Sequence, residues 1–144
     1  MKAQGFSIIE IIIVIMIIAL FATFTYPSYR ESITRARRID GKVALLDLAA
    51  RMEQYYAENQ TYQGATLGTG SASDVFYSNR SAQNYYILLI SKQTDTEFNL
   101  AAIPRGPQAQ GDKACQTLSF NSFGVKGITP GPGGTPSASA TQCW

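Results

Sequence analysis

The amino-acid sequence predicts an α+β fold in which a long amino-terminal helix packs on a small antiparallel sheet. Three observations predict it: an apolar run over residues 6–24, a helical pattern of apolar residues from 33 to 59, and three strand-like runs after residue 84. Packing the apolar side of the helix on one face of the sheet would bury both surfaces. A chain of 144 residues is long enough for one domain and an appendage.

The apolar run is the first element. Its nineteen residues carry a single charge, Glu10. As a helix the run would be about 28 Å long, close to the hydrocarbon thickness of a bilayer. An ionisable residue inside such a segment is costly unless a partner neutralises it, so Glu10 marks a functional site by default.

The start of the chain differs from an ordinary secretory signal. Such a signal has its small-residue cleavage site after the apolar core, whereas here the small residue Gly5 comes before it. Cleavage after Gly5 would remove residues 1–5 and leave the whole apolar helix attached to the protein.

The helix is predicted to continue past Pro27, which would kink it, and to end near Asn59. Two neighbouring apolar stripes follow residue 33 and require a covering layer. The first contains Ile39, Val43, Leu46 and Ala50, and the second contains Leu45, Leu48, Met52 and Tyr55. The opposite, polar side carries Arg38, Lys42, Asp47, Arg51 and Glu58.

The sheet is expected after a long loop over residues 64–84, which is rich in Gly, Ser, Ala and Asn and has Phe76 and Tyr77 as its only large apolar anchors. Strand-like runs follow at residues 85–90, 98–103 and 116–120. A polar turn around residues 93–96 separates the first two runs, and an antiparallel meander packed on the amphipathic side of the helix would bury both apolar surfaces. Residues 127–142 contain so much Pro and Gly that no regular structure is expected there.

Two cysteines, Cys115 and Cys143, lie near the end of the sequence. In an exported domain they indicate a disulfide, and a pair of buried free thiols is the alternative. A disulfide closing a loop of this length would stabilise the fold by roughly 3–4 kcal/mol in the chain-entropy model.

The orientation of the apolar helix in a membrane is a point of conflict. The positive-inside rule would place the domain in the cytoplasm, because the basic residues near the helix ends are Lys2 on one side and Arg30, Arg35, Arg37 and Arg38 on the other. The cysteines instead favour a domain outside the cytoplasm. We give them more weight than the positive-inside rule, because the acidic residues Glu31 and Asp40 offset part of the positive charge of the four arginines.

Several function classes are disfavoured. The chain has no histidine and therefore no serine–histidine or cysteine–histidine pair. Phosphate-binding loops, nucleophile elbows and zinc-spaced cysteines are also missing from the sequence. We therefore expect neither an enzyme nor a bound cofactor or metal. A net charge of +2 is too small to indicate nucleic acid on its own.

The segment Gly5-Phe6-Ser7-Ile8-Ile9-Glu10 resembles the start of the type IV pilin family. The resemblance implies that a prepilin peptidase removes residues 1–5 and methylates the new amino terminus at Phe6. It further implies a filament-core helix over residues 6–29, a globular pilin domain over 30–144, and a disulfide-bounded region from Cys115 to Cys143.

The function that the resemblance implies is assembly into a bacterial pilus. The precursor would lie in the inner membrane, and the mature subunit would join identical or related pilins in an extracellular helical fibre for adhesion, twitching motility or DNA uptake. Transfer of the apolar helix from lipid into a bundle of helices changes its surroundings little. The direction and register of assembly would therefore come from polar contacts. Glu10 could compensate the cationic amine of Phe6 within one subunit or in a neighbouring subunit, and the resemblance favours a neighbour.

Two alternatives remain open beside a bulk pilus subunit. A specialised minor pilin could act as a DNA-uptake receptor, although the charges beyond residue 64 sum to only +1. They are Arg80, Lys92, Arg105, Lys113 and Lys126 against Asp74, Asp95, Glu97 and Asp112. The second alternative is a pseudopilin of a secretion machine, which the disulfide-bounded tail disfavours.

Overall fold

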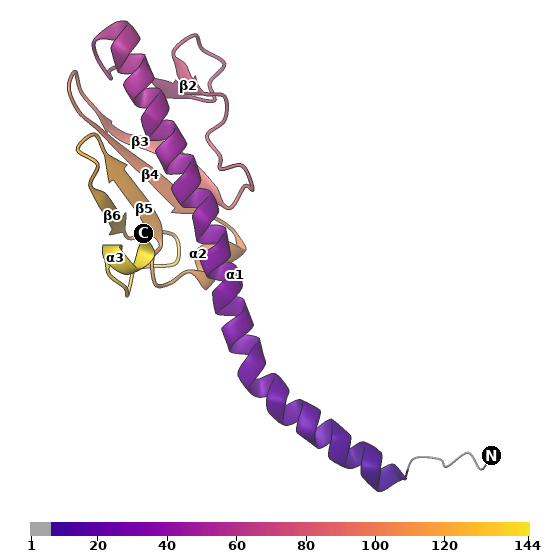
Figure 1. Cartoon of the computed structure of the whole chain (residues 1–144). Helices are drawn as coiled ribbons and strands as arrows, with labels where there is room; N and C mark the ends of the chain where they lie inside the picture. Colours follow the sequence, from indigo (N-terminus) through magenta and orange to yellow (C-terminus); the bar gives the residue numbers. More distant parts are fainter. Residues whose placement is uncertain (1–6) are drawn as a thin grey trace. The chain divides into compact units, whose positions relative to one another are not determined.

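The computed structural model describes residues 7–144 and contains one long helix and a four-stranded sheet (Figure 1). Helix α1 spans Ile8–Asn59, so its predicted end is confirmed. The chain divides into two compact units, one up to Ile33 and one from Thr34 onward. The helix contributes to both, and its main chain is helical at position 27. The kink predicted at Pro27 stays a prediction.

The sheet of the second unit is the expected antiparallel meander. Its strands are β3 (Tyr86–Gln93), β4 (Phe98–Pro104), β5 (Thr117–Asn121) and β6 (Lys126–Thr129), and they pair in chain order. The register places Tyr86 opposite Pro104 and Gln93 opposite Phe98. One end of the β3–β4 pair therefore carries the segments around residues 85 and 105, and the other end carries the turn at 94–97.

Only one of the two predicted apolar stripes of α1 covers the sheet. Leu45, Leu48 and Met52 are completely buried and belong to the core, together with Leu88 and Leu100 from the sheet. The other predicted stripe, formed by Ile39, Val43 and Leu46, remains exposed. The prediction that both stripes would be covered is therefore wrong.

Gly41 lets the ring of Tyr86 approach the helix closely. A Cβ at position 41 would lie 2.9 Å from two ring carbons of Tyr86, which is closer than van der Waals contact permits. The ring fills the space beside α1 and is itself fully buried. This glycine therefore serves packing against the sheet rather than a turn.

The segments outside the main sheet are more ordered than the sequence indicates. The predicted loop contains two short parallel strands, β1 (Thr66–Leu67) and β2 (Asp74–Phe76). Helix α2 spans Pro107–Gly111 and helix α3 spans Ala140–Cys143. The expectation of an irregular tail is wrong for its two ends, because residues 127–129 pair with β5 and residues 140–143 are helical.

The predicted disulfide is present. Cys115 and Cys143 are joined with a Cα–Cα distance of 5.6 Å, and both are buried. The bond holds α3 against the segment that precedes β5. The long helix, the antiparallel sheet and the disulfide-bounded end together confirm the predicted α+β fold.

Candidate functional site

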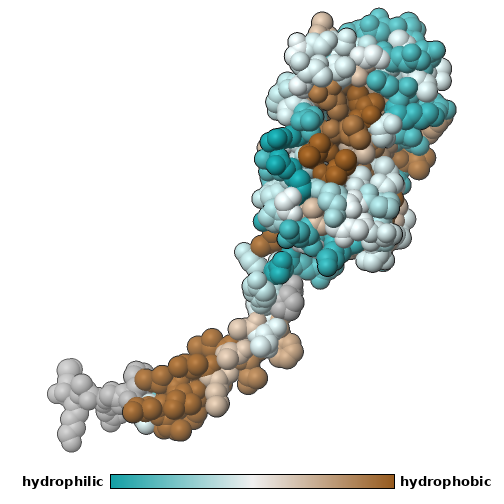
Figure 2. Space-filling model, turned by 180° about the vertical axis from the view of Figure 1, so that it is seen from behind, coloured by the Kyte–Doolittle hydropathy of each residue, from teal (hydrophilic) through white to brown (hydrophobic). Residues whose placement is uncertain are grey.

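The apolar half of α1 presents its side chains outward all around the helix. Within the described residues, α1 is the one helix long and apolar enough to cross a membrane by length and composition, and Figure 2 shows its apolar surface near the amino terminus. Glu10 lies in the first helical turn, where a negative charge interacts favourably with the helix dipole. Gly5 and Phe6 lie outside the described residues, so the predicted pairing of Glu10 with the Phe6 amine stays a prediction.

In the second unit, three arginines from different segments meet beside the start of β3. The guanidinium groups of Arg80 and Arg105 both donate to Oδ1 of Asn84, at 3.5 and 2.7 Å. The guanidinium of Arg37, on α1, lies 4.7 Å from the ring centroid of Tyr85. We call Arg37, Arg80 and Arg105 the arginine cluster.

Asn84 joins Arg80 and Arg105 through its side chain, and its backbone shapes the turn between them and β3. Its φ of 63° is in the left-handed region, which asparagine tolerates better than most residues. Its amide closes a turn by donating to the carbonyl of Ser81 at 2.9 Å. On the other side, the amide of Arg105 donates to the carbonyl of Tyr85 at 2.9 Å, so the two arginine-bearing segments are fixed to each other.

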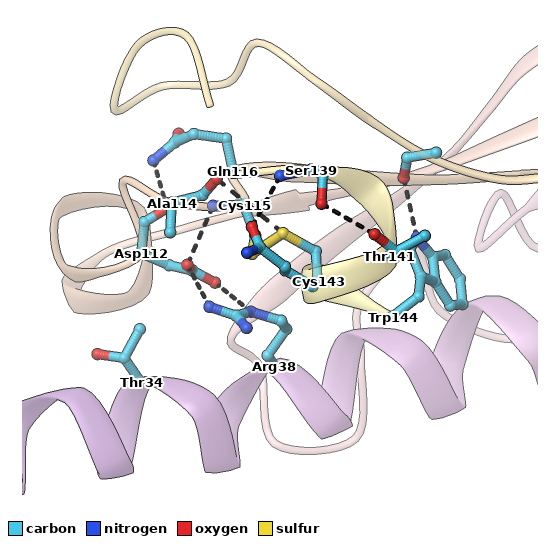
Figure 3. The surroundings of a disulfide bond; sticks show 12 residues. Thr34, Arg38, Asp112, Ala114, Cys115, Gln116, Ser139, Thr141, Cys143 and Trp144 are labelled. Carbon is cyan, nitrogen blue, oxygen red and sulfur yellow. Dashed lines mark hydrogen bonds and ion pairs between the residues drawn. A yellow bond between two sulfur atoms is a disulfide. The ribbon is translucent and has the colours of Figure 1, made fainter. Parts of the chain in front are cut away.

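A buried polar network fixes α2 and the disulfide to α1 (Figure 3). Arg38 makes two hydrogen bonds to the carboxylate of Asp112, at 2.9 and 2.7 Å, and both residues are buried. The side-chain amide of Gln108 donates to Asp112 and to the Thr34 carbonyl. The network corrects the prediction that Arg38 lies on the solvated side of the helix.

Burial shapes the ionisation of two side chains next to this network. Desolvation lowers the pKa of Lys42, and the nearby charges of Arg38 and Lys126 lower it further, while Asp112 acts in the opposite direction. The ammonium of Lys42 donates to the main-chain oxygen of Trp144 at 2.9 Å. Burial also raises the pKa of Tyr86 well above its usual value, so its hydroxyl stays neutral.

Opposite charges gather at the two ends of the β3–β4 pair. Besides the arginine cluster, the end around Tyr86 and Pro104 has Lys42 nearby, because the Tyr86 ring packs on Gly41, and Asp40 is the neighbouring acid, which accepts from the Gln83 amide at 3.1 Å. Four carboxylates lie toward the other end or on the adjoining end of α1, and their partners in the structure are hydroxyl or amide groups. They are Glu53, Glu58, Asp74 and Asp95.

Asp74, one of these four carboxylates, is held in its charged form by hydrogen bonds. The hydroxyl of Thr66, which donates to Asp74 at 2.6 Å, holds the pKa of that carboxyl below its usual value. Asp95 accepts a hydrogen bond from the hydroxyl of Thr61, and Glu97 pairs with Lys92. Among the described residues, no group of three or more His, Cys, Asp or Glu could hold a metal ion.

Sequence reasoning counted Arg80 and Arg105 among the basic residues but did not find the arginine cluster. The convergence depends on the strand register and on the left-handed backbone at Asn84, and neither can be read from charge counts. The sequence contains one signal of this turn: Asn84 follows Ser81 by three residues, a composition typical of turns, directly before the predicted strand.

Comparisons with known proteins place the chain in a family. Residues 27–119 match a family model described as type IV minor pilin ComP, DNA uptake sequence receptor. Residues 1–26 match the prokaryotic N-terminal methylation motif. Among solved structures, the non-core minor pilin PilV of Neisseria meningitidis has a TM-score of 0.53 and 21% sequence identity, covering 76% of this chain and 99% of that chain. At this identity the likeness shows the fold alone. The first family model matches more than half of the length of this chain. The chain therefore belongs to the type IV minor pilin ComP family and is a subunit of a type IV pilus.

Proposed function

We propose that this pilin is a DNA receptor of the pilus and that the arginine cluster binds the phosphates of DNA. The observation that carries the proposal is the convergence of Arg80 and Arg105 on Asn84 beside Arg37. The family to which the chain belongs is described as a DNA uptake sequence receptor. This description favours the DNA-receptor alternative over the bulk subunit and over the pseudopilin.

The chemistry of the cluster suits a phosphate backbone. A guanidinium carries five donors in a planar fork, and phosphate oxygens accept from it in pairs. Asn84 engages one nitrogen each of Arg80 and Arg105, so further donors of both remain available. The carboxylates at the other end of the domain would repel DNA, which favours binding at the basic end.

The domain is suitable for a binding experiment without the apolar helix. All residues of its hydrophobic core lie between 44 and 144, and the disulfide is internal to this range. A protein comprising residues 30–144 therefore retains the core, the arginine cluster and the buried network. Binding of a labelled DNA duplex is measured by gel shift over a series of salt concentrations.

Arg105→Gln is expected to weaken binding and to reduce the slope of log K against log salt by about 0.9, the contribution of one neutralised phosphate. Lys92→Gln is the matched control, because it removes one positive charge that pairs with Glu97 at the opposite end of β3. Equal losses in the two variants would show that net charge, and not the cluster, governs binding.

We also propose the maturation and assembly path. The precursor lies in the inner membrane, a prepilin peptidase cleaves after Gly5 and methylates Phe6, and Glu10 compensates the Phe6 amine of a neighbour as the subunit enters the extracellular fibre. The methylation motif and the exposed apolar segment support this path. Cleavage leaves the amine one helical turn from Glu10 along the chain.

Glu10→Val tests the role of the carboxylate in assembly. The variant is expected to remain in the membrane, because valine makes the helix more apolar, and to be depleted from sheared surface fibres. Quantitative immunoblots of the membrane and fibre fractions give the two amounts. Wild-type incorporation into fibres would remove Glu10 from the assembly mechanism.

A further inference from the structure

The ring of Tyr77 is exposed to solvent and yet fixed in position. Its side chain is 83% exposed. One face of the ring stacks on the ring of Phe76, with ring centroids 5.2 Å apart and ring planes 16° apart. Phe76 is buried at the end of β2, and the guanidinium of Arg51, on α1, lies 4.8 Å from its ring centroid. Tyr77 is therefore the outermost member of a stack that begins in the core, and its second face is open to solvent.

The main chain around Tyr77 is held from two sides. The Gly68 amide donates to the Phe76 carbonyl at 2.9 Å, and the Leu88 amide, on β3, donates to the Asn79 carbonyl at 2.8 Å. Gly68 has a φ of 61°, and a Cβ at this position would lie 3.0 Å from the Asn79 nitrogen, so a larger residue would disturb the contact. The ring is thus in place before a ligand binds, which lowers the entropic cost of binding.

Tyr77 is also close to the arginine cluster along the chain. Arg80 comes three positions later and is fixed beside β3 by a β-bridge to Ile87. Three residues of fully extended chain span at most about 11 Å, and this length corresponds to about three base steps of duplex DNA. A DNA strand with a phosphate at Arg80 therefore has bases within reach of the Tyr77 ring.

We propose that Tyr77 stacks on an unpaired base of the DNA whose phosphates the arginine cluster binds. Every nucleobase has a flat π face, and proteins that bind single strands hold the bases on exposed aromatic rings. The proposal rests on the proposed DNA binding and adds the preferred form of the ligand, which is DNA with a single-stranded segment beside the phosphates at the cluster.

The stack with Phe76 favours an unpaired base over a base step inside a duplex. A side chain that wedges between two base pairs contacts one pair on each of its faces. Phe76 covers one face of Tyr77, so the ring can stack on a single base but has no second face for the next pair.

The charges around Tyr77 favour contact with a base over contact with a phosphate. Asp74 lies three positions before Tyr77, and its carboxylate accepts from the hydroxyl of Thr66 at 2.6 Å. The guanidinium of Arg51 is paired with Asp47 at 3.3 Å. Phosphates are therefore attracted to the arginine cluster and not to Tyr77, whereas an uncharged base is not repelled there.

Binding of three DNA probes to the protein of residues 30–144 tests the proposal. The probes share one duplex and are blunt, or carry a short single-stranded tail, or carry the same tail without its bases. The two tailed probes have the same phosphates, so they differ only in the presence of bases. We expect the wild type to bind the complete tail at least about fivefold more tightly than the abasic tail, with equal slopes of log K against log salt. Equal affinities for the two tails would overturn the proposal.

Two substitutions assign the preference to the ring. Tyr77→Leu removes the ring but keeps an apolar side chain, and it is expected to abolish the preference for the complete tail without changing the affinity for the abasic tail. Tyr77→Phe keeps the ring and is expected to retain the preference. Melting of each protein verifies folding. A folded Tyr77→Leu variant that keeps the wild-type preference would contradict the role of this ring.

Phe123→Leu is the matched control, because it makes the same change at another exposed aromatic side chain. Phe123 lies on the turn after β5. There the Ser122 amide donates to the Phe98 carbonyl at 3.1 Å, at the end of β4 opposite to Arg105. We expect this variant to bind all three probes as the wild type does. A loss of the preference equal to that in Tyr77→Leu would show that exposed aromatic area in general, and not Tyr77, determines it.

The remaining outcomes separate this proposal from the proposed DNA binding. Salt-dependent binding of all probes without a preference for bases would contradict stacking on Tyr77 and leave phosphate binding by the arginine cluster intact. Failure of the wild type to bind any probe would contradict both proposals. An equal loss of affinity for the blunt and the tailed probe in Tyr77→Leu would show that the ring enters the duplex, which would overturn the assignment to an unpaired base.

Discussion

At the residue scale, the ion pair between Arg38 and Asp112 has the largest expected effect on stability. The Asp112 side chain is completely buried, and its oxygens also accept from Gln108 and from the Cys115 amide. A buried ion pair of this kind contributes little beyond an apolar replacement, but loss of one partner leaves a buried charge uncompensated. The pair therefore joins α1 to the end of α2, and removal of either side chain alone is expected to destabilise the fold.

Arg38→Met removes the guanidinium and keeps an unbranched side chain that can fill part of the space. We expect the free energy of unfolding to fall by about 3–5 kcal/mol, because Asp112 would remain charged and buried. Urea unfolding of the domain measures the change. An effect below about 1 kcal/mol would show that water reaches Asp112.

The hydroxyl of Tyr62 makes stability dependent on pH at the alkaline end. Burial, followed by the hydrogen bond to Glu53, raises the pKa of Tyr62 from 10.0 to about 12. The folded state therefore holds the phenolic proton more tightly than the unfolded state. The corresponding stability is complete below pH 10 and is lost as the pH rises through about 12.

Tyr62→Phe tests this linkage. Because phenylalanine has no proton to lose, the variant is expected to show a smaller loss of unfolding free energy between pH 10 and 12 than the wild type. Urea unfolding at a series of pH values gives both curves. Tyr86 contributes in the same direction in both proteins and therefore cancels in the comparison. Parallel curves would contradict the role of Tyr62.

At the scale of elements, the sequence predicted α1 and the first three strands of the sheet well. Helical periodicity gave the end of α1 at Asn59, and apolar runs gave β3, β4 and β5 within a few residues. Periodicity could not decide which of two adjacent apolar stripes faces the sheet. That choice depends on the shape of the opposing surface, including the ring of Tyr86 at Gly41.

The last strand could not be predicted from its own residues. The segment of β6 contains Gly127 and precedes Pro130, so its local composition favours a loop. It becomes a strand because it pairs with β5 over four positions and because the Trp144 indole donates to the Gly127 carbonyl at 2.9 Å. Tertiary contacts of this kind override a weak local preference.

The disulfide stabilises the carboxy-terminal segment of the chain. It closes a 28-residue separation that includes β5, β6 and the Pro- and Gly-rich segment. Cys143→Ser is expected to lower the free energy of unfolding by roughly 3–4 kcal/mol and to lower the melting temperature of the domain. A melting temperature that is the same for the variant and the wild type under oxidising conditions would contradict this contribution.

At the scale of the whole domain, the division of charge bears on the proposed DNA binding. The arginine cluster lies at the start of β3, whereas Glu53, Glu58, Asp74 and Asp95 lie toward the opposite end. A DNA duplex bound at the cluster would therefore keep its phosphates away from these carboxylates.

The candidate DNA site could be predicted from the sequence only as a small net positive charge. Charge counts beyond residue 64 gave a net charge of +1, which is a small signal. The structure concentrates positive charge locally, because the register of β3 and β4 and the turn at Asn84 bring residues 80 and 105 together beside α1. Net charge omits this arrangement, whereas local density determines phosphate binding.

The amount of duplex DNA retained by purified fibres tests the central claim most directly. Fibres carrying the Arg80→Gln, Arg105→Gln double variant are compared with fibres carrying Lys92→Gln, Lys126→Gln, at equal subunit content and equal salt. We predict that the cluster variant retains less than a tenth of the DNA held by wild-type fibres and that the control retains more than half. Equal retention by the two variants would contradict the assignment of DNA binding to the arginine cluster.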